Sequence, residues 1–177
     1  IVFGLIFSAI IANNDQFNTI WLAKNKIKIQ VPCDWEIIVH SPNNLSSSIG
    51  FQLMTNKAED GTAHSTNIVV NTIDLTNLDE NLSFVKSVIK KTTPESIQLD
   101  YKKWAIQQWV GIQDKVSYTI YDAKVVHDKT SLGVHIRLAF PNLPDNPKDY
   151  NQQMKTIIEK LISSINEINP DNKKGKD

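Results

Sequence analysis

The stretch VSYTIYDAKVVHDKTSLGVHIRLAF, residues 116–140, decides the fold. Apolar side chains alternate with smaller or more polar ones from 116 to 121 and again from 132 to 140. This is the two-residue period of a β-strand with one buried face. The segment from His127 to Thr130 separates the two runs, and a connection that short cannot cross over a sheet. The two strands are therefore predicted to be antiparallel neighbours.

Similar patterns predict further strands on the N-terminal side of this hairpin. We expect strand structure throughout residues 96–140, with a break at Gly111. Pro32 ends an earlier run of alternation, and the Asp-Gly pair at 60–61 marks a hairpin turn. The other strands are expected at residues 27–31, 36–40, 49–54 and 67–75.

Two amphipathic helices are expected, one before and one after the β-rich half of the chain. Asn77 is placed to cap the first helix, which reaches Lys91 and is stopped by Pro94. Asn146 is expected to cap the second, with Pro147 at its first helical position. The apolar stripe of the second helix consists of Tyr150, Met154, Ile157, Ile158, Leu161, Ile162 and Ile165. A stripe of this kind must be buried, and the sheet that ends at Phe140 is the nearest apolar surface.

These elements predict an α+β fold with one hydrophobic core. The chain has 177 residues, of which 41% are hydrophobic, enough for one sizeable core. We therefore expect a single domain at residues 20–167. The polar residues 168–177 are expected to form a disordered tail.

Residues 1–12, IVFGLIFSAIIA, form an unbroken stretch of apolar and small residues. Its length fits the apolar part of a signal peptide, about 7–15 residues, and falls short of the roughly 20 needed to span a membrane. We expect residues 1–15 to be a signal peptide or hydrophobic leader, with no stable membrane anchor after its removal. A buried N-terminal strand or helix is the alternative. The only cysteine, Cys33, lies well beyond this run, so we expect neither a lipid anchor nor an intrachain disulfide.

Charge and motifs argue against several classes of function. Nineteen basic and nineteen acidic residues cancel, so the electrostatic footprint of a nucleic-acid-binding protein is missing. The sequence lacks a nucleophile elbow, a phosphate loop, a dinucleotide fingerprint and a zinc-protease motif. Its four histidines are scattered singly, without zinc-ligand spacing. We therefore expect no metal and no cofactor.

Asp34 and Glu36, which flank Trp35, are the pair that could serve a small hydrolase as general acid and base. Two carboxylates at this spacing are common on the wet face of a strand, and nothing else in the sequence supports a catalytic site. We expect the protein not to be an enzyme, and the hydrolase stays an alternative.

The candidate site residues are aromatic and polar side chains of the β-rich half. Trp and Tyr combine a large apolar area with a polar group, which favours them as anchors in interfaces. Burial under helices or loops is the alternative for these aromatics. The sheet face opposite the stripe from Leu132 to Phe140 becomes a polar recognition surface if no helix covers it. The residues predicted to bind a partner are Trp104, Trp109, Tyr118, Tyr121, His135 and Arg137.

The chain resembles the PsbP-like family, which includes DcrB-like exported proteins. The marks of the resemblance are VPCDW at 31–35, NIVVNTI at 67–73, a helix starting near Asp79, the W-V-G step at 109–111 and LISSI at 161–165. The resemblance implies a single antiparallel β-sheet flanked by α-helices, an α/β/α sandwich. It also implies non-enzymatic work in the bacterial periplasm, and no catalytic residues carry over.

Family members look like adaptors, assembly factors, secretion-linked chaperones or toxin-immunity proteins that hold another protein through sheet or loop surfaces. The resemblance therefore implies a protein partner, with this chain a monomer or a small homo-oligomer. A carrier that holds a lipid or another apolar molecule in a cleft between sheet and helix is the alternative.

Overall fold

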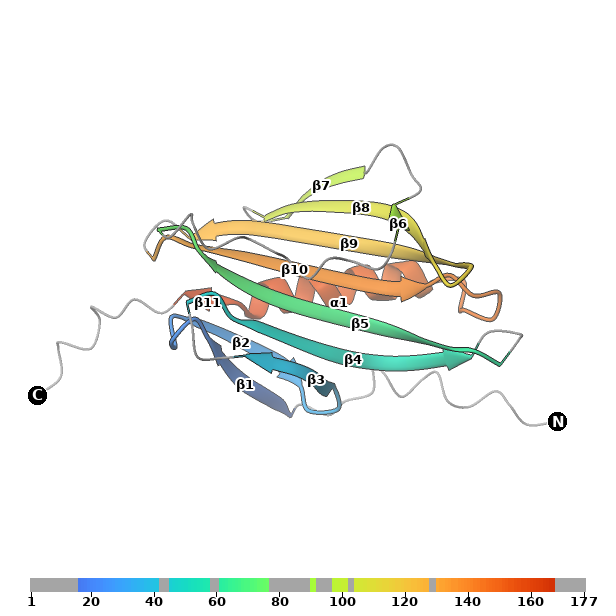
Figure 1. Ribbon diagram of the computed structural model, residues 1–177, viewed down its shortest axis with the longest axis horizontal. Coiled ribbons are helices and arrows are strands. Elements are labelled where there is room, and N and C mark those ends of the chain that lie inside the picture. Colours follow the sequence, from blue (N-terminus) through green and yellow to red (C-terminus); the bar gives the residue numbers. More distant parts are fainter. Residues whose placement is uncertain are drawn as a thin grey trace, which may run out of the picture.

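The computed structural model describes residues 16–41, 45–57, 61–76, 90–91, 97–101, 104–127 and 130–167. Two antiparallel sheets and one helix make up the regular structure of these residues (Figure 1). The large sheet has the strand order β3-β4-β5-β10-β9-β8-β6, and β7 also pairs with β8. Its strands are β3 (Glu36–Ser41), β4 (Ser48–Lys57), β5 (Ala63–Asp74), β6 (Lys90–Lys91), β7 (Ile97–Tyr101), β8 (Trp104–Gln113), β9 (Val116–His127) and β10 (Leu132–Pro141).

The small sheet has the order β1-β2-β11, with β1 at Phe17–Leu22, β2 at Ile27–Pro32 and β11 at Asn166–Glu167. The hydroxyl groups of two serines join it to the rest of the molecule. The hydroxyl of Ser164 donates to the carbonyl of Gln30 and accepts from its N–H, at 3.1 and 3.2 Å. The N–H of Ala23 donates to the buried hydroxyl of Ser47 at 2.9 Å. The small sheet is thereby fixed both to the end of the helix and to the large sheet.

The fold-deciding stretch forms the antiparallel pair that its alternation predicts. Strands β9 and β10 run side by side with Leu132 opposite His127 and Pro141 opposite Tyr118. The apolar stripe of β10, from Leu132 to Phe140, is at most 1% exposed. Its burial is the reason that the register of this pair is specified, since a one-residue slip would turn the stripe toward water.

The helix α1 (Tyr150–Ser164) lies behind the large sheet (Figure 1) and buries the predicted stripe. Tyr150, Met154 and Ile158 are at most 3% exposed, and the rings of Tyr150 and Phe140 pack edge to face at 5.4 Å. The space between sheet and helix is thus filled by side chains. A carrier of apolar molecules would need an open cleft in this space between the sheet and the helix.

The predicted start of this helix was wrong by three residues. The helix begins at Tyr150, and its N-cap residue is Asp149. Asn146 does not cap it, because its side-chain amide donates to the carbonyl of Pro141 at 2.7 Å instead. The backbone bond from Tyr150 to Pro147 at 3.0 Å shows that residues 147–150 form a separate turn.

The predicted fold class, a single antiparallel sheet flanked by helices, was also wrong. The structure is mostly β, with two sheets, and the described residues contain one helix on one face of the large sheet. Of the other predicted helix, residues 77–89 lie outside the described residues. Lys90 and Lys91, expected at its C-terminus, form β6 opposite Ile112 and Gly111 of β8. The expected leader at 1–15 and tail at 168–177 also lie outside the described residues.

Candidate functional site

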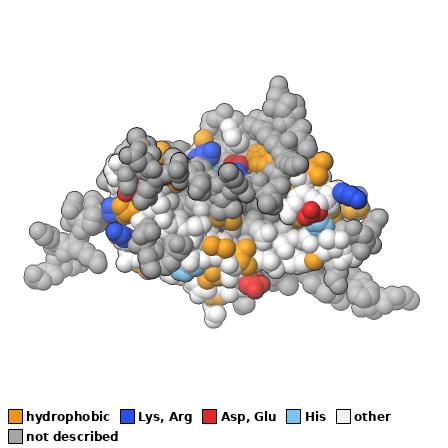
Figure 2. Space-filling view, viewed as in Figure 1, with side chains coloured by type: hydrophobic (Ala, Val, Ile, Leu, Met, Phe, Trp, Pro, Cys, Tyr) orange, Lys and Arg blue, Asp and Glu red, His pale blue; other side chains and the backbone are white. Residues whose placement is uncertain are grey.

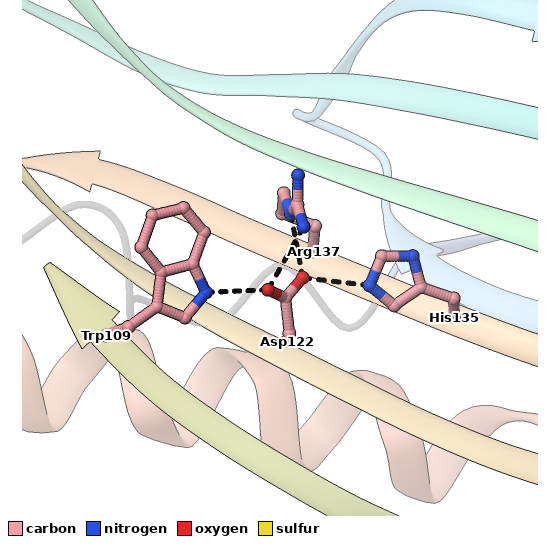
Figure 3. A network of polar contacts seen from close by, with 4 residues as sticks. All are labelled: Trp109, Asp122, His135 and Arg137. Carbon is pink, nitrogen blue, oxygen red and sulfur yellow. Dashed lines mark hydrogen bonds and ion pairs between the residues drawn. The ribbon is translucent and has the colours of Figure 1, made fainter. Parts of the chain in front are cut away.

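A polar network lies on the face of the large sheet that points away from α1 (Figure 3). Asp122 stands opposite Arg137 in the register of β9 and β10. Trp109 comes from the neighbouring β8, and His135 lies two residues before Arg137, on the same face. Strand alternation on three adjacent strands therefore brings four side chains to one point.

Asp122 accepts four hydrogen bonds in this network. Its Oδ1 accepts from His135 Nε2 at 2.8 Å and from Arg137 Nε at 2.7 Å. Its Oδ2 accepts from Trp109 Nε1 at 2.7 Å and from Arg137 Nη2 at 3.1 Å. The guanidinium also lies over the Trp109 ring, 5.7 Å from its centroid.

The pKa of Asp122 follows from these contacts. Burial by itself would raise that pKa, because it disfavours the charged form. The hydrogen bonds from His135 and Arg137, the charge of Arg137 and the bond from Trp109 outweigh burial and hold the pKa well below its usual range. A carboxylate has about four lone-pair sites, and all are taken here. The network therefore fixes three strands to one another and leaves Asp122 no free lone pair for a further hydrogen bond.

Most residues predicted to bind a partner are buried. Trp104, Trp109, Tyr118, Tyr121 and His135 are between 2% and 9% exposed, while the Arg137 side chain is 25% exposed. In the described structure these five offer little area to a partner, and the binding role of all six stays a prediction.

The structure brings three of these six residues together and leaves the others apart. Trp109, His135 and Arg137 meet at Asp122. Trp104 and Tyr121 belong to the core that includes α1, where the Tyr121 hydroxyl donates to Asn151 Oδ1 at 2.6 Å. Tyr118 forms a separate hydrogen bond, 2.9 Å long, between its hydroxyl and Nδ1 of His64.

The residue that sequence reasoning missed is Asp122 itself. From the sequence alone, an Asp close to the end of a predicted strand is typical of a turn, where Asp serves local hydrogen bonds. Asp122 lies instead inside β9, which continues to His127, and it is 6% exposed. The available signal was an acidic residue on a strand whose antiparallel neighbour carries His and Arg on the same face.

The carboxylate pair Asp34 and Glu36 lies at the surface. Both residues are exposed, and within the described residues neither forms an ion pair. Trp35 between them is half-buried, its ring 5.6 Å from that of Phe51. Groups of three or more His, Cys, Asp or Glu side chains able to hold a metal ion are absent from the described part of the chain.

The strand β3, which begins at Glu36, carries three adjacent exposed hydrophobic side chains. Ile37, Ile38 and Val39 are 49%, 47% and 52% exposed, and β3 is an edge strand paired only with β4. The β3–β4 register shifts between Ile37 and Val39. A Cβ built on Gly50 of β4 would lie 3.4 Å from Ile38 Cγ1 and 3.6 Å from Val39 Cβ, so the shift places both side chains beside one glycine.

The space-filling view shows hydrophobic side chains gathered in the lower middle of the visible face, with an acidic side chain at their border (Figure 2). Figure 1 places β3 at this position. We call Asp34, Glu36, Ile37, Ile38 and Val39 the β3 surface.

Comparison with known proteins relates the chain to others at the level of fold. No family model and no curated protein sequence matches it. It is similar to the Ran-binding protein Mog1p of Saccharomyces cerevisiae, with a TM-score of 0.53, 11% identity, and coverage of 88% of this chain and 97% of Mog1p. A mutant of Mog1 gives the same TM-score of 0.53 at 11% identity, covering 89% and 98%. A Bacteroides thetaiotaomicron protein gives 0.51 at 10% identity, covering 88% of this chain and 50% of its own.

At these identities the likeness shows the fold alone. No family or sequence match confirms membership of the PsbP-like or DcrB-like group. Among the described residues, no helix is long and apolar enough to cross a membrane.

Proposed function

We propose that this chain is a non-catalytic protein-binding module and that the β3 surface is where a protein partner docks. The observation that carries the proposal is the run of three adjacent apolar side chains, each about half exposed, on an edge strand. An uncovered apolar edge is a hazard for aggregation, so natural proteins usually protect it or use it for binding. The Ran-binding activity in the name of Mog1p, a protein of the same fold, is consistent with this proposal.

The partner is expected to contact side chains and not to extend the sheet. The register shift at Ile37 and Val39 interrupts the regular spacing of backbone groups that an added strand needs. The exposed side chains themselves supply apolar area for docking, with Glu36 at the border.

More specific roles belong to the same proposal. The family resemblance favours an adaptor, a secretion-linked chaperone or a toxin-immunity protein. The apolar segment at residues 1–12 favours export, with the bacterial periplasm as its location.

The proposal is tested by capture from an extract of the source cells with tagged full-length protein, followed by quantitative mass spectrometry. Ile38→Ser changes the β3 surface, and Val126→Ser is the matched control because Val126 is an apolar side chain 57% exposed on β9. We expect a stoichiometric protein to be retained by the wild type and by Val126→Ser, and to be lost by Ile38→Ser. Equal capture by all three proteins would contradict the proposal.

A further inference from the structure

A second exposed apolar surface lies on the outer face of β1. Phe17 and Trp21 are 57% and 42% exposed, while Ile20 and Leu22 on the same strand are at most 9% exposed. The outward residues of β1 stand opposite outward residues of β2, and Trp21 is paired with Lys28. This hairpin therefore turns two aromatic side chains and a lysine toward solvent.

The turn of the same hairpin adds two more cations. Lys24 is exposed and Lys26 half-buried, and both follow directly after β1. Asp74 is an acid that lies close enough to interact with both. Its pKa is lowered first by the hydrogen bonds from Thr76 and then by these two lysines. Glu167 of β11 stands opposite Ile27 of the same hairpin, and three lysines against these two acids still leave a positive excess. We call Phe17, Trp21, Lys24, Lys26 and Lys28 the β1 surface.

The β1 surface and the β3 surface thus match in apolar character and differ in the sign of their charge. The β1 surface has aromatic side chains with lysines at one end. The β3 surface has aliphatic side chains with two carboxylates at one end, neither of them ion-paired within the described residues. Together they contain five of the seven large hydrophobic side chains that are exposed in the described structure.

The chain path fixes how the two surfaces are arranged. Phe17 stands opposite Pro32, and the N–H of Cys33 donates to the carbonyl of Gln16 at 3.2 Å. The start of β1 therefore adjoins the short segment that leads to Glu36. The acidic end of the β3 surface accordingly lies on the side of the molecule where β1 starts. The lysines of the turn lie at the other end of β1, roughly 20 Å away for six extended residues.

We propose that these two surfaces form one self-complementary interface and that its occupant is a second copy of this chain in a twofold dimer. A twofold axis through the combined surface reverses its direction, so the acidic end of each copy meets the lysine turn of the other. Phe17, Trp21 and the apolar residues of β3 then lie at the centre, where water is excluded, with the charges at the rim. The inference rests on the proposed function, since it names the protein that docks on the β3 surface.

The test uses charge reversal in the full-length chain and sedimentation velocity over a concentration series. The wild type is expected to change from the 20.0 kDa monomer to a species of twice that mass. Lys24→Glu/Lys26→Glu gives each copy two acidic ends, and Asp34→Lys/Glu36→Lys gives two basic ends. Each variant alone is expected to dimerise about tenfold more weakly than the wild type, because like charges meet at the rim.

A mixture of the two variants is the decisive sample. In the mixed pair every acidic end again faces a basic end, so dimerisation is expected to return to about the wild-type level and to weaken with added salt. The substituted side chains are exposed or half-buried at the surface, and unchanged thermal unfolding checks that both variants fold. Val126→Ser, away from both surfaces in sequence, is expected to dimerise as the wild type does.

The inference is overturned if the wild type is monomeric at every concentration, or if it dimerises and neither reversal weakens the dimer. It is also overturned if the mixture dimerises no better than the separate variants. The proposed function fails on different grounds, namely when Ile38→Ser captures the same proteins as the wild type. A monomeric wild type that loses another captured protein on Ile38→Ser would refute the dimer alone.

Discussion

Arg137 of β10 and Asp122 of β9 form a bidentate ion pair. Nε of the guanidinium lies 2.7 Å from Oδ1 of the carboxylate, and Nη2 lies 3.1 Å from Oδ2. Because the pair also holds His135 and Trp109, it connects three strands on the face of the sheet away from α1. Bidentate geometry of this kind is among the stronger charge-assisted contacts in proteins. Removing the Asp122 carboxylate leaves Trp109, His135 and Arg137 without their shared acceptor.

Asp122→Asn is expected to destabilise the fold by about 3–5 kcal/mol, the usual range for breaking a buried ion pair. The amide keeps the shape of the carboxyl group but loses its charge and presents its own N–H groups to the donors of His135 and Arg137. Urea unfolding at pH 7 measures the change. Asp145→Asn, at an exposed acid in the loop between β10 and α1, is the control and is expected to stay within about 0.5 kcal/mol of the wild type. A similar small change for Asp122→Asn would show that the network contributes little.

Because of this contact, the stability of the fold is expected to depend on pH. The folded-state pKa of Asp122 lies below the unfolded value, which is about 3.9. The contribution of this carboxylate is therefore fully present above about pH 4 and is lost as the pH falls toward the folded-state pKa. Thermal unfolding of the wild type and Asp122→Asn between pH 7 and pH 2 should give melting temperatures that converge as the pH decreases. A constant difference down to pH 2 would contradict this assignment.

The sequence predicts most strands of the large sheet and only β2 of the small sheet, for a physical reason. Alternation is visible in residues 116–140 because one face of each strand is buried. In β1 the first three residues are all exposed, so alternation is confined to its end and no strand was predicted there. The two-residue strand β11 depends on pairing with β2 across the chain, and local sequence cannot reveal it.

The candidate site depends even more on long-range pairing. His135 and Arg137 could be assigned to one face from the alternation of β10 alone. Their meeting with Asp122 requires the β9–β10 register, and the place of Trp109 requires that of β8 and β9. The pattern at residues 36–40 predicted a strand, but its exposure arises from its edge position and from the register shift beside Gly50.

Tyr150→Phe is expected to lower the free energy of unfolding by about 1–2 kcal/mol, because it leaves the buried hydroxyl of Thr66 without its partner. The Tyr150 hydroxyl lies 2.9 Å from Thr66 Oγ1 and 3.0 Å from Met54 Sδ, and Thr66 is fully buried. Urea unfolding measures the loss. Thr55→Ala removes an exposed hydroxyl bonded to Gln52 at 2.9 Å, and it should change stability by less than about 0.5 kcal/mol. Equal effects of the two substitutions would rule out a special contribution from the buried bond.

Substitution of two glycines by alanine is expected to have opposite effects. Gly50 lies inside β4, and an added Cβ would meet Ile38, Val39 and Val69 at 3.4–3.7 Å, which is ordinary contact. Gly50→Ala should therefore stabilise the fold by about 0.5 kcal/mol, since alanine loses less backbone freedom on folding.

Gly61 has open space around it but a φ of +82° in the turn before β5. Gly61→Ala should destabilise by about 1 kcal/mol, because side-chain-bearing residues are strained in that conformation. Thermal unfolding of both variants decides whether free space around the glycine or its backbone angle controls the effect of alanine. If free space around the glycine controlled the outcome, Gly61 would tolerate alanine better than Gly50; the backbone angle predicts the reverse order, because strain in φ persists however much room the methyl group has.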